Sequence, residues 1–184
     1  LDYHATMAEY LAAKTRLFDQ VLPPGGTAVI NADVPEAAGL VARTRAAGRK
    51  VLTLGRAGQE FRLDLAEPLP HGIDLRFTAG GKAYRAELPL VGGFQAYNVL
   101  TALALVVADG ADLDTAAGLL EQLKGIPGRV ELVASHPNGA PVYVDYSHKP
   151  GALETVLNAL RPHTSGALVV VFGCGGDRDR AKRP

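Results

Sequence analysis

Short apolar strand patterns alternate with helix patterns near the start of the chain, and this alternation limits the fold more than any other feature. Residues 5–22 place apolar side chains three and four positions apart, which is typical of a helix, and the Pro-Pro-Gly-Gly at 23–26 ends it. Residues 27–31 and 50–54 are buried-strand patterns, with a second helix at 35–47 between them. Strands separated by helices predict an open α/β sheet that is largely parallel.

The middle of the chain has a different pattern. Residues 61–65, 73–78 and 83–88 alternate apolar and polar side chains, and Pro-rich or Gly-Gly turns separate them. Such segments predict small antiparallel strands. Two helices are expected after them, at 95–108 and 113–123.

The Gly-Ile-Pro-Gly at residues 125–128 is the candidate domain boundary, because glycine and proline cluster there between patterned segments. Beyond it, residues 129–134 and 141–146 read as a strand hairpin, and residues 151–160 as a helix. Residues 167–172 are all apolar, which predicts a strand in the middle of a parallel sheet.

Composition excludes several classes of protein. The 19 basic side chains balance 19 acidic ones, so we expect neither a nucleic-acid partner nor a polybasic membrane anchor. The longest mostly apolar run, residues 99–108, is far shorter than the ~20 residues of a membrane-spanning helix. A single cysteine, Cys174, rules out an internal disulfide or a multi-cysteine zinc site and fits a reducing cytosol.

Lys14 is the most unusual residue, because the apolar stripe of the first helix runs through it, between Tyr10 and Phe18. The structural interpretation, which periodicity alone favours, is a lysine whose stem packs while its ammonium reaches water. The functional interpretation is a buried lysine. Burial lowers a lysine pKa, and the neutral amine reacts with carbon dioxide to form a carbamate, whose anionic oxygens suit Mg²⁺.

Three polar residues lie where ligands often bind. Asn98, in the first turn of a strong helix, is either a local hydrogen-bonding residue or an amide that reads a nucleobase edge. Asp145 ends a strand, where it either caps a loop or accepts hydrogen bonds from ribose hydroxyls. His148 follows in a turn, and with no second histidine at metal-ligand spacing we do not expect zinc.

A glycine-rich loop at residues 173–176 follows the last apolar segment. It resembles half of a dinucleotide-binding fingerprint, which leaves a non-catalytic nucleotide-binding module open as a function. Arg178, just beyond it, is either part of a solvated charge run or a bidentate clamp for a carboxylate. We expect Cys174 to be a packing residue rather than a nucleophile.

Five strings, in order along almost the whole chain, together resemble the Mur ligase family. They are Leu1-Asp-Tyr-His-Ala-Thr-Met7 with Tyr10-Leu-Ala-Ala-Lys14; Gly93-Phe-Gln-Ala-Tyr-Asn98; Gly125-Ile-Pro-Gly-Arg129-Val-Glu131; Val144-Asp-Tyr-Ser-His148-Lys-Pro150; and Val171-Phe-Gly-Cys-Gly-Gly-Asp-Arg-Asp179.

The resemblance implies a fold and an activity. Residues 1–127 would be the second half of a central ATP-binding domain with a P-loop-type α/β fold, and residues 128–184 the beginning of a Rossmann-like C-terminal domain. The activity would be ATP-dependent amide-bond formation in bacterial peptidoglycan synthesis, through an acyl phosphate. In the branch that the chain resembles, meso-diaminopimelate is added to UDP-MurNAc-L-Ala-D-Glu by a cytoplasmic enzyme that we expect to be a monomer.

The resemblance also implies roles for individual residues. Lys14 would be the carbamylated lysine that helps to hold Mg²⁺, so the functional interpretation of its apolar stripe replaces the structural one. The other contacts would be made by Asn98 to adenine, Arg129 to the phosphates, Asp145 to ribose, His148 near the phosphates, and Arg178 to a carboxylate of the added amino acid.

Some family features are missing from these residues. A magnesium-binding histidine would precede Leu1, and His4 does not take its place. There is no G-x-x-x-x-G-K-[ST] phosphate loop, there are no UDP-sugar contacts, and the Asp-Asn-Pro-Arg specificity signature would follow Pro184. We therefore expect an excerpt of a longer protein, inactive alone. A lysine-adding ligase and a folylpolyglutamate synthase remain as alternatives within the superfamily.

Overall fold

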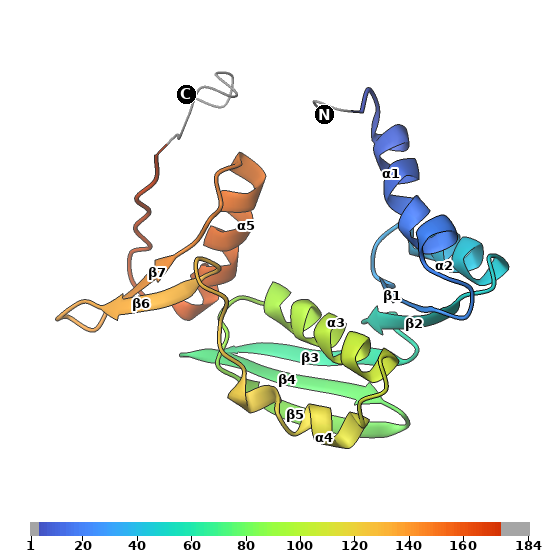
Figure 1. The fold of residues 1–184 in the computed structure, drawn as a ribbon. Helices are drawn as coiled ribbons and strands as arrows, with labels where there is room; N and C mark the ends of the chain where they lie inside the picture. Colours follow the sequence, from blue (N-terminus) through green and yellow to red (C-terminus); the bar gives the residue numbers. More distant parts are fainter. Residues whose placement is uncertain (1–3, 174–184) are drawn as a thin grey trace.

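The computed structural model describes residues 4–173 and contains one five-stranded sheet (Figure 1). Its first three strands pair in parallel, and its last three form an antiparallel meander. The strands, in spatial order, are β1 (Thr27–Asn31), β2 (Lys50–Gly55), β3 (Phe61–Leu69), β4 (Gly72–Ala79) and β5 (Lys82–Leu88). The parallel and antiparallel strands predicted from the sequence are both present. They share a single mixed sheet because β2 pairs in parallel with the first two residues of β3, Phe61 and Arg62.

The first helix is longer than a plain α-helix. Helix α1 (Met7–Arg16) begins at Thr6, whose hydroxyl accepts a hydrogen bond from the Glu9 N–H at 3.1 Å. It continues as a π-helical segment, η1 (Leu17–Val21). The predicted helix at residues 5–22 is therefore present, but its last turn is wider than the 3.6-residue period indicates.

Helices cover the parallel strands on both sides. Helix α2 (Ala37–Ala46) packs on β1 and β2 around a small core of Ala28, Ile30, Ala37 and Val51. Helix α3 (Phe94–Ala108) lies along the sheet and contacts β1, β2 and β3 (Figure 1).

The main core lies between α3 and the meander. Leu75 and Phe77 of β4, with Leu100 and Ala104 of α3, have no exposed surface. The alternate residues of β4 carry the polar face, where the carboxylate of Asp74 pairs with two arginines of β4 and β5. This alternation is what the sequence pattern predicts for a half-buried antiparallel strand.

The segment after α3 differs from its prediction. The expected helix at 113–123 is divided into α4 (Leu113–Ala117) and a 3₁₀ turn, η2 (Leu120–Gln122). Gly118 lies at the C-cap of α4, and glycine is a weak helix former. Leu120 still reaches the main core.

A smaller unit follows residue 128. It contains a hairpin of β6 (Glu131–Ser135) and β7 (Pro141–Val144), helix α5 (Pro150–Leu160) and the turn η3 (Arg161–His163). A third apolar cluster joins the two units, because Val91, before α3, packs with Val130 and Leu160. His163 adds a polar contact, with its Nδ1 2.7 Å from the Leu69 carbonyl oxygen of β3.

The strand predicted at residues 167–172 is wrong: these residues form neither helix nor strand. Val169 and Val171 are 79% and 95% exposed, and no strand of residues 4–173 lies alongside to pair with them. A strand needs a neighbouring strand to pair with its backbone N–H and C=O groups. Apolar composition alone is therefore not sufficient to form one.

Two glycines give a matched test of the sheet. A Cβ on Gly72 would lie 2.1 Å from the Leu88 carbonyl oxygen, whereas a Cβ on Gly39 of α2 meets nothing within 4 Å. We expect Gly72→Ala to lower the unfolding free energy by about 1–3 kcal/mol, because β5 must move away. Gly39→Ala should raise it by about 0.5–1 kcal/mol, because alanine favours the helix. Thermal unfolding of the complete protein measures both, and equal melting temperatures for the two variants would contradict the packing described.

Candidate functional site

The junction between the two units is built around the carboxylate of Asp145, which follows β7. Its Oδ2 accepts a hydrogen bond from the Val130 N–H at 2.9 Å, and its Oδ1 accepts one from the Ser147 N–H at 2.7 Å. The N–H of Tyr146 donates to the Gly128 carbonyl oxygen at 2.8 Å. Asp145 and its neighbour therefore tie the end of β7 to the turn that precedes β6.

Val130 is the strained residue of this junction. Its φ of +50° lies in the left-handed region, which a β-branched side chain rarely adopts and which costs about 1–3 kcal/mol. Two contacts hold it there: the hydrogen bond to Asp145, and burial of its side chain, 8% exposed, in the cluster that joins the units. The strain lies immediately beside Arg129.

Arg129 extends over an aromatic ring rather than an acid. Its guanidinium carbon lies 5.2 Å from the centroid of the Tyr146 ring, and the His148 ring meets the edge of the same tyrosine at 5.3 Å. Within residues 4–173, Arg129 forms no ion pair, and its side chain is exposed. The guanidinium keeps its donors for an anion.

The pKa of Asp145 is below the ordinary aspartate value of 3.8. Partial burial on its own would raise this pKa, but the hydrogen bonds from Ser147 and Val130 and the positive charge of Arg129 together lower it. A carboxylate of this kind is ionised at neutral pH and acts only as an acceptor.

The lowered pKa predicts an acid-sensitive junction. A depressed folded-state pKa contributes stability that is complete above the unfolded-state value and is lost as the pH falls through the folded-state value. We expect Asp145→Asn to lower the stability by about 1 kcal/mol at pH 7, because a charged acceptor is removed. This difference should begin to narrow as the pH falls below about 4, where the unfolded chain starts to bind a proton, and it should close only once the pH is below the folded-state pKa. Melting temperatures of both proteins between pH 7 and pH 3 measure it, and a constant difference would contradict the prediction.

Asn98 lies on the other side of the junction. It is exposed on α3, and its amide Nδ2 donates to the Gln95 Oε1 at 3.0 Å. Gln95 and Arg129 both line a cavity of about 280 Å³, together with Leu90, Val130 and Tyr143. The amide of Asn98 is thus one hydrogen bond away from the cavity that Arg129 borders.

Lys14 is not buried, although the apolar stripe of its helix predicts that it is. Within residues 4–173 its side chain is exposed, and its Nζ lies 5.4 Å from the centroid of the Tyr10 ring. The stripe is exposed too, with Met7 at 66% and Leu17 at 56%. Burial of Lys14 is therefore a wrong prediction for this structure, because no described element covers that face of α1.

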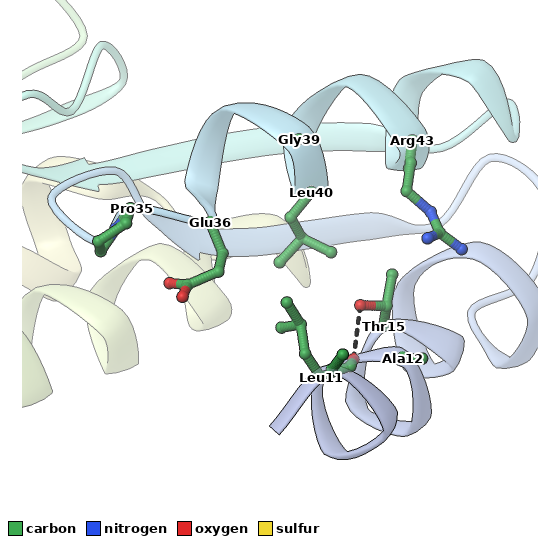
Figure 2. Close-up of a pocket in the computed structure, with 9 residues that line it drawn as sticks. Leu11, Ala12, Thr15, Pro35, Glu36, Gly39, Leu40 and Arg43 are labelled. Atoms are coloured by element: carbon green, nitrogen blue, oxygen red, sulfur yellow. Dashed lines mark hydrogen bonds between the residues drawn. The ribbon is translucent and has the colours of Figure 1, made fainter. Parts of the chain in front are cut away.

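A groove does lie on the other side of α1. It encloses about 410 Å³ between α1 and α2, and Figure 2 shows Leu11 and Leu40 pointing toward each other across it. Thr15 donates to the Leu11 carbonyl oxygen at 2.8 Å, and Arg43 borders the groove, but Lys14 does not line it. Residues 4–173 also contain no cluster of three His, Cys, Asp or Glu side chains that would hold a metal ion.

The structure thus brings some of the predicted site residues together and leaves others apart. Arg129, Asp145 and His148 form one cluster, and Asn98 approaches it through Gln95. Helix α1, which carries Lys14, lies at the opposite end of the molecule from β6 and β7 (Figure 1). Arg178 and Cys174 lie outside the described residues.

Among residues 4–173, none of the helices has the length and apolar character needed to cross a bilayer.

Sequence patterns did not point to three residues of the cluster. Tyr146 has no feature in the sequence that pairs it with Arg129, and only the fold brings the two together. Gln95 lies one helical turn before Asn98, but the sequence does not show that it lines a cavity. The left-handed backbone of Val130 has no sequence signal, because valine is disfavoured there. A glycine at that position would have given one.

Comparison with known proteins places this geometry in a family. The sequence matches the Mur ligase middle domain over residues 1–106 and the Mur ligase glutamate ligase domain over residues 128–184. It is 50% identical over 184 residues to the UDP-N-acetylmuramoyl-L-alanyl-D-glutamate–2,6-diaminopimelate ligase of Mesorhizobium japonicum, covering 100% of this chain and 38% of that protein. The chain therefore spans little more than a third of this relative.

Solved structures agree. A UDP-N-acetylmuramoyl-L-alanyl-D-glutamate–2,6-diaminopimelate ligase superposes with a TM-score of 0.74 at 33% identity, over 98% of this chain and 37% of that one. The Mycobacterium tuberculosis folylpolyglutamate synthase complexed with ADP superposes with a TM-score of 0.68 at 26% identity, over 86% of this chain and 35% of that one. The α/β fold, the two matched domains and the relatives of this chain show that it belongs to the Mur ligase family.

Proposed function

We propose that this chain is part of an ATP-dependent ligase that adds meso-diaminopimelate to UDP-MurNAc-L-Ala-D-Glu in peptidoglycan synthesis. The observation that carries this proposal is the 50% identity, over the whole chain, to a relative named for that reaction. A folylpolyglutamate synthase, at 26% identity, is the more distant relative. We further propose that residues 1–127 and 128–184 belong to the central and C-terminal domains, and that the enzyme is a cytoplasmic monomer.

The cluster at the junction fits the chemistry of a nucleotide. An exposed amide on Asn98 offers both a donor and an acceptor to a base edge, and the ionised carboxylate of Asp145 has acceptor capacity left for ribose hydroxyls. Arg129, which forms no ion pair among the described residues, offers paired N–H donors to phosphate, with His148 beside the same tyrosine ring. ATP, when bound, would supply the phosphoryl group that activates the substrate carboxylate as an acyl phosphate.

These residues would act by binding and by neutralising charge. The attack of a carboxylate on a phosphate brings two anions together, so a fixed guanidinium lowers the barrier by stabilising the added charge. Arg129 is held for this role by the Tyr146 ring on one side and by the strained Val130 turn in the backbone. Arg178 would bind a carboxylate of the incoming amino acid.

Magnesium fits less well on this part of the chain. Lys14 as a carbamate would provide anionic oxygen ligands, which Mg²⁺ prefers. Within residues 4–173, however, no group of three His, Cys, Asp or Glu side chains could hold the ion. We therefore propose Lys14 as one ligand of a site that other segments of the enzyme complete, and we assign no reaction step to the metal.

The full-length protein tests the function. We expect it to release phosphate from ATP only when UDP-MurNAc-L-Ala-D-Glu and meso-diaminopimelate are both present. L-Lysine in place of diaminopimelate, and folate with glutamate in place of both substrates, should give background rates. Turnover with lysine or with folate would assign another branch of the family, and tight binding of NAD without any turnover would favour the nucleotide-binding module.

A further inference from the structure

Asp33, just after β1, is a hydrogen-bonding centre that no step above uses. Its Oδ2 accepts from the Arg56 N–H at 2.8 Å, and its Oδ1 accepts from the Ala57 N–H at 2.8 Å. The Tyr97 hydroxyl of α3 also donates to Oδ2, at 2.9 Å. One carboxylate therefore joins three segments that are up to 64 residues apart in sequence.

The local backbone is shaped around this carboxylate. The Asp33 N–H donates to the Asn31 Oδ1 at 2.9 Å, which turns the chain sharply at the end of β1. Gly55, at the end of β2, has a φ of +113°, and a Cβ there would lie 2.6 Å from the Asp33 Oδ2. A glycine is thus required for the carboxylate to reach the loop after β2.

Tyr97 carries this contact into α3. Its ring packs against the main core while its hydroxyl reaches Asp33, so the residue is held at both ends. The next residue is Asn98, whose amide faces Gln95 on the border of the junction cavity. The Asp33–Tyr97 contact fixes the first turns of α3 at the carboxyl ends of β1 and β2, which is the edge where open α/β sheets bind ligands.

We propose that Asp33, acting through Tyr97, is a positioning residue that orients Asn98 toward the nucleotide base. This inference rests on the proposed function, because it takes Asn98 to contact adenine. Loss of the contact lets the first turns of α3 shift, which weakens nucleotide binding and lowers the selectivity for adenine. It leaves the groups that face the phosphates, Arg129 and His148, in place.

The test compares steady-state kinetics of full-length variants with ATP and with GTP. We expect Asp33→Asn to raise KM for ATP about tenfold with kcat changed less than about threefold, because binding rather than chemistry is affected. The preference for ATP over GTP should fall by a similar factor. Tyr97→Phe, which removes only the hydroxyl, should raise KM about threefold, and the double variant should be no worse than Asp33→Asn, since both remove the same contact.

Asp112→Asn is the matched control. Asp112 caps α4 by accepting from the Thr115 N–H at 2.8 Å, in the same unit but away from the junction. Because asparagine caps a helix about as well as aspartate, this variant should leave the melting temperature, KM and base preference nearly unchanged. Should Asp33→Asn fail to fold, Tyr97→Phe carries the test alone. An active wild-type enzyme whose Asp33 and Tyr97 variants keep the KM and base preference of the control would overturn this inference, whereas a wild type inactive with ATP would overturn the proposed function instead.

Discussion

Lys14→Ala in the full-length protein is expected to lower kcat by about a thousandfold or more, because the proposed carbamate would be lost as a ligand for Mg²⁺. In residues 4–173 the lysine is exposed, with its Nζ 5.4 Å from the centroid of the Tyr10 ring, so the prediction requires other segments of the enzyme to enclose it. Phosphate release with both substrates measures the loss. Arg16→Ala, on the same helix, is the control and should keep nearly full activity.

Chemical rescue separates a carbamate from a positive charge at this position. Formate or acetate added to the Lys14→Ala protein supplies a free carboxylate in place of the carbamate group, so partial recovery of kcat is expected. Lys14→Arg keeps the charge but does not form a carbamate, and it should remain inactive. A Lys14→Ala protein with wild-type kcat would show that this residue has no part in the reaction.

Arg129→Ala is expected to lower kcat/KM by about a thousandfold, because the proposed site would lose the guanidinium that neutralises charge on the transferred phosphoryl group. Arg129→Lys should recover little, since an ammonium lacks the planar paired donors and the stacking on Tyr146. Arg45→Ala, on the exposed side of α2, provides the control for lost charge. Unchanged kcat and KM in Arg129→Ala would remove this residue from the site.

The fold was predictable where local pattern and burial agree. Residues 27–31 became β1 with the predicted bounds because a short run that is rich in β-branched side chains and follows a Pro-Pro-Gly-Gly turn favours a strand over a helix. Residues 167–172 have an equally strong pattern, yet they form no strand, because strand formation needs a partner that local sequence does not specify. The π-helical turn of η1 was missed because adding one residue per turn hardly alters the spacing of apolar side chains.

The candidate site was predictable only in its residues, not in its arrangement. The position of Asp145 at a strand end indicated either a loop-capping residue or a ribose ligand. In the structure both of its carboxylate oxygens accept hydrogen bonds from backbone N–H groups, which is the loop-capping role. The strain at Val130 and the centre at Asp33 depend on contacts between segments far apart in sequence. Lys14 shows the reverse error, since an apolar stripe indicates which face can be buried but not what covers it.

A crystal structure of the full-length protein with a non-hydrolysable ATP analogue tests the central claim most directly. It should show the base at Asn98, the ribose within hydrogen-bond distance of Asp145, the phosphates at Arg129, and extra density for a carbamate on Lys14. A nucleotide bound away from the junction of the two units, with Asn98, Arg129 and Asp145 all facing solvent, would contradict the account.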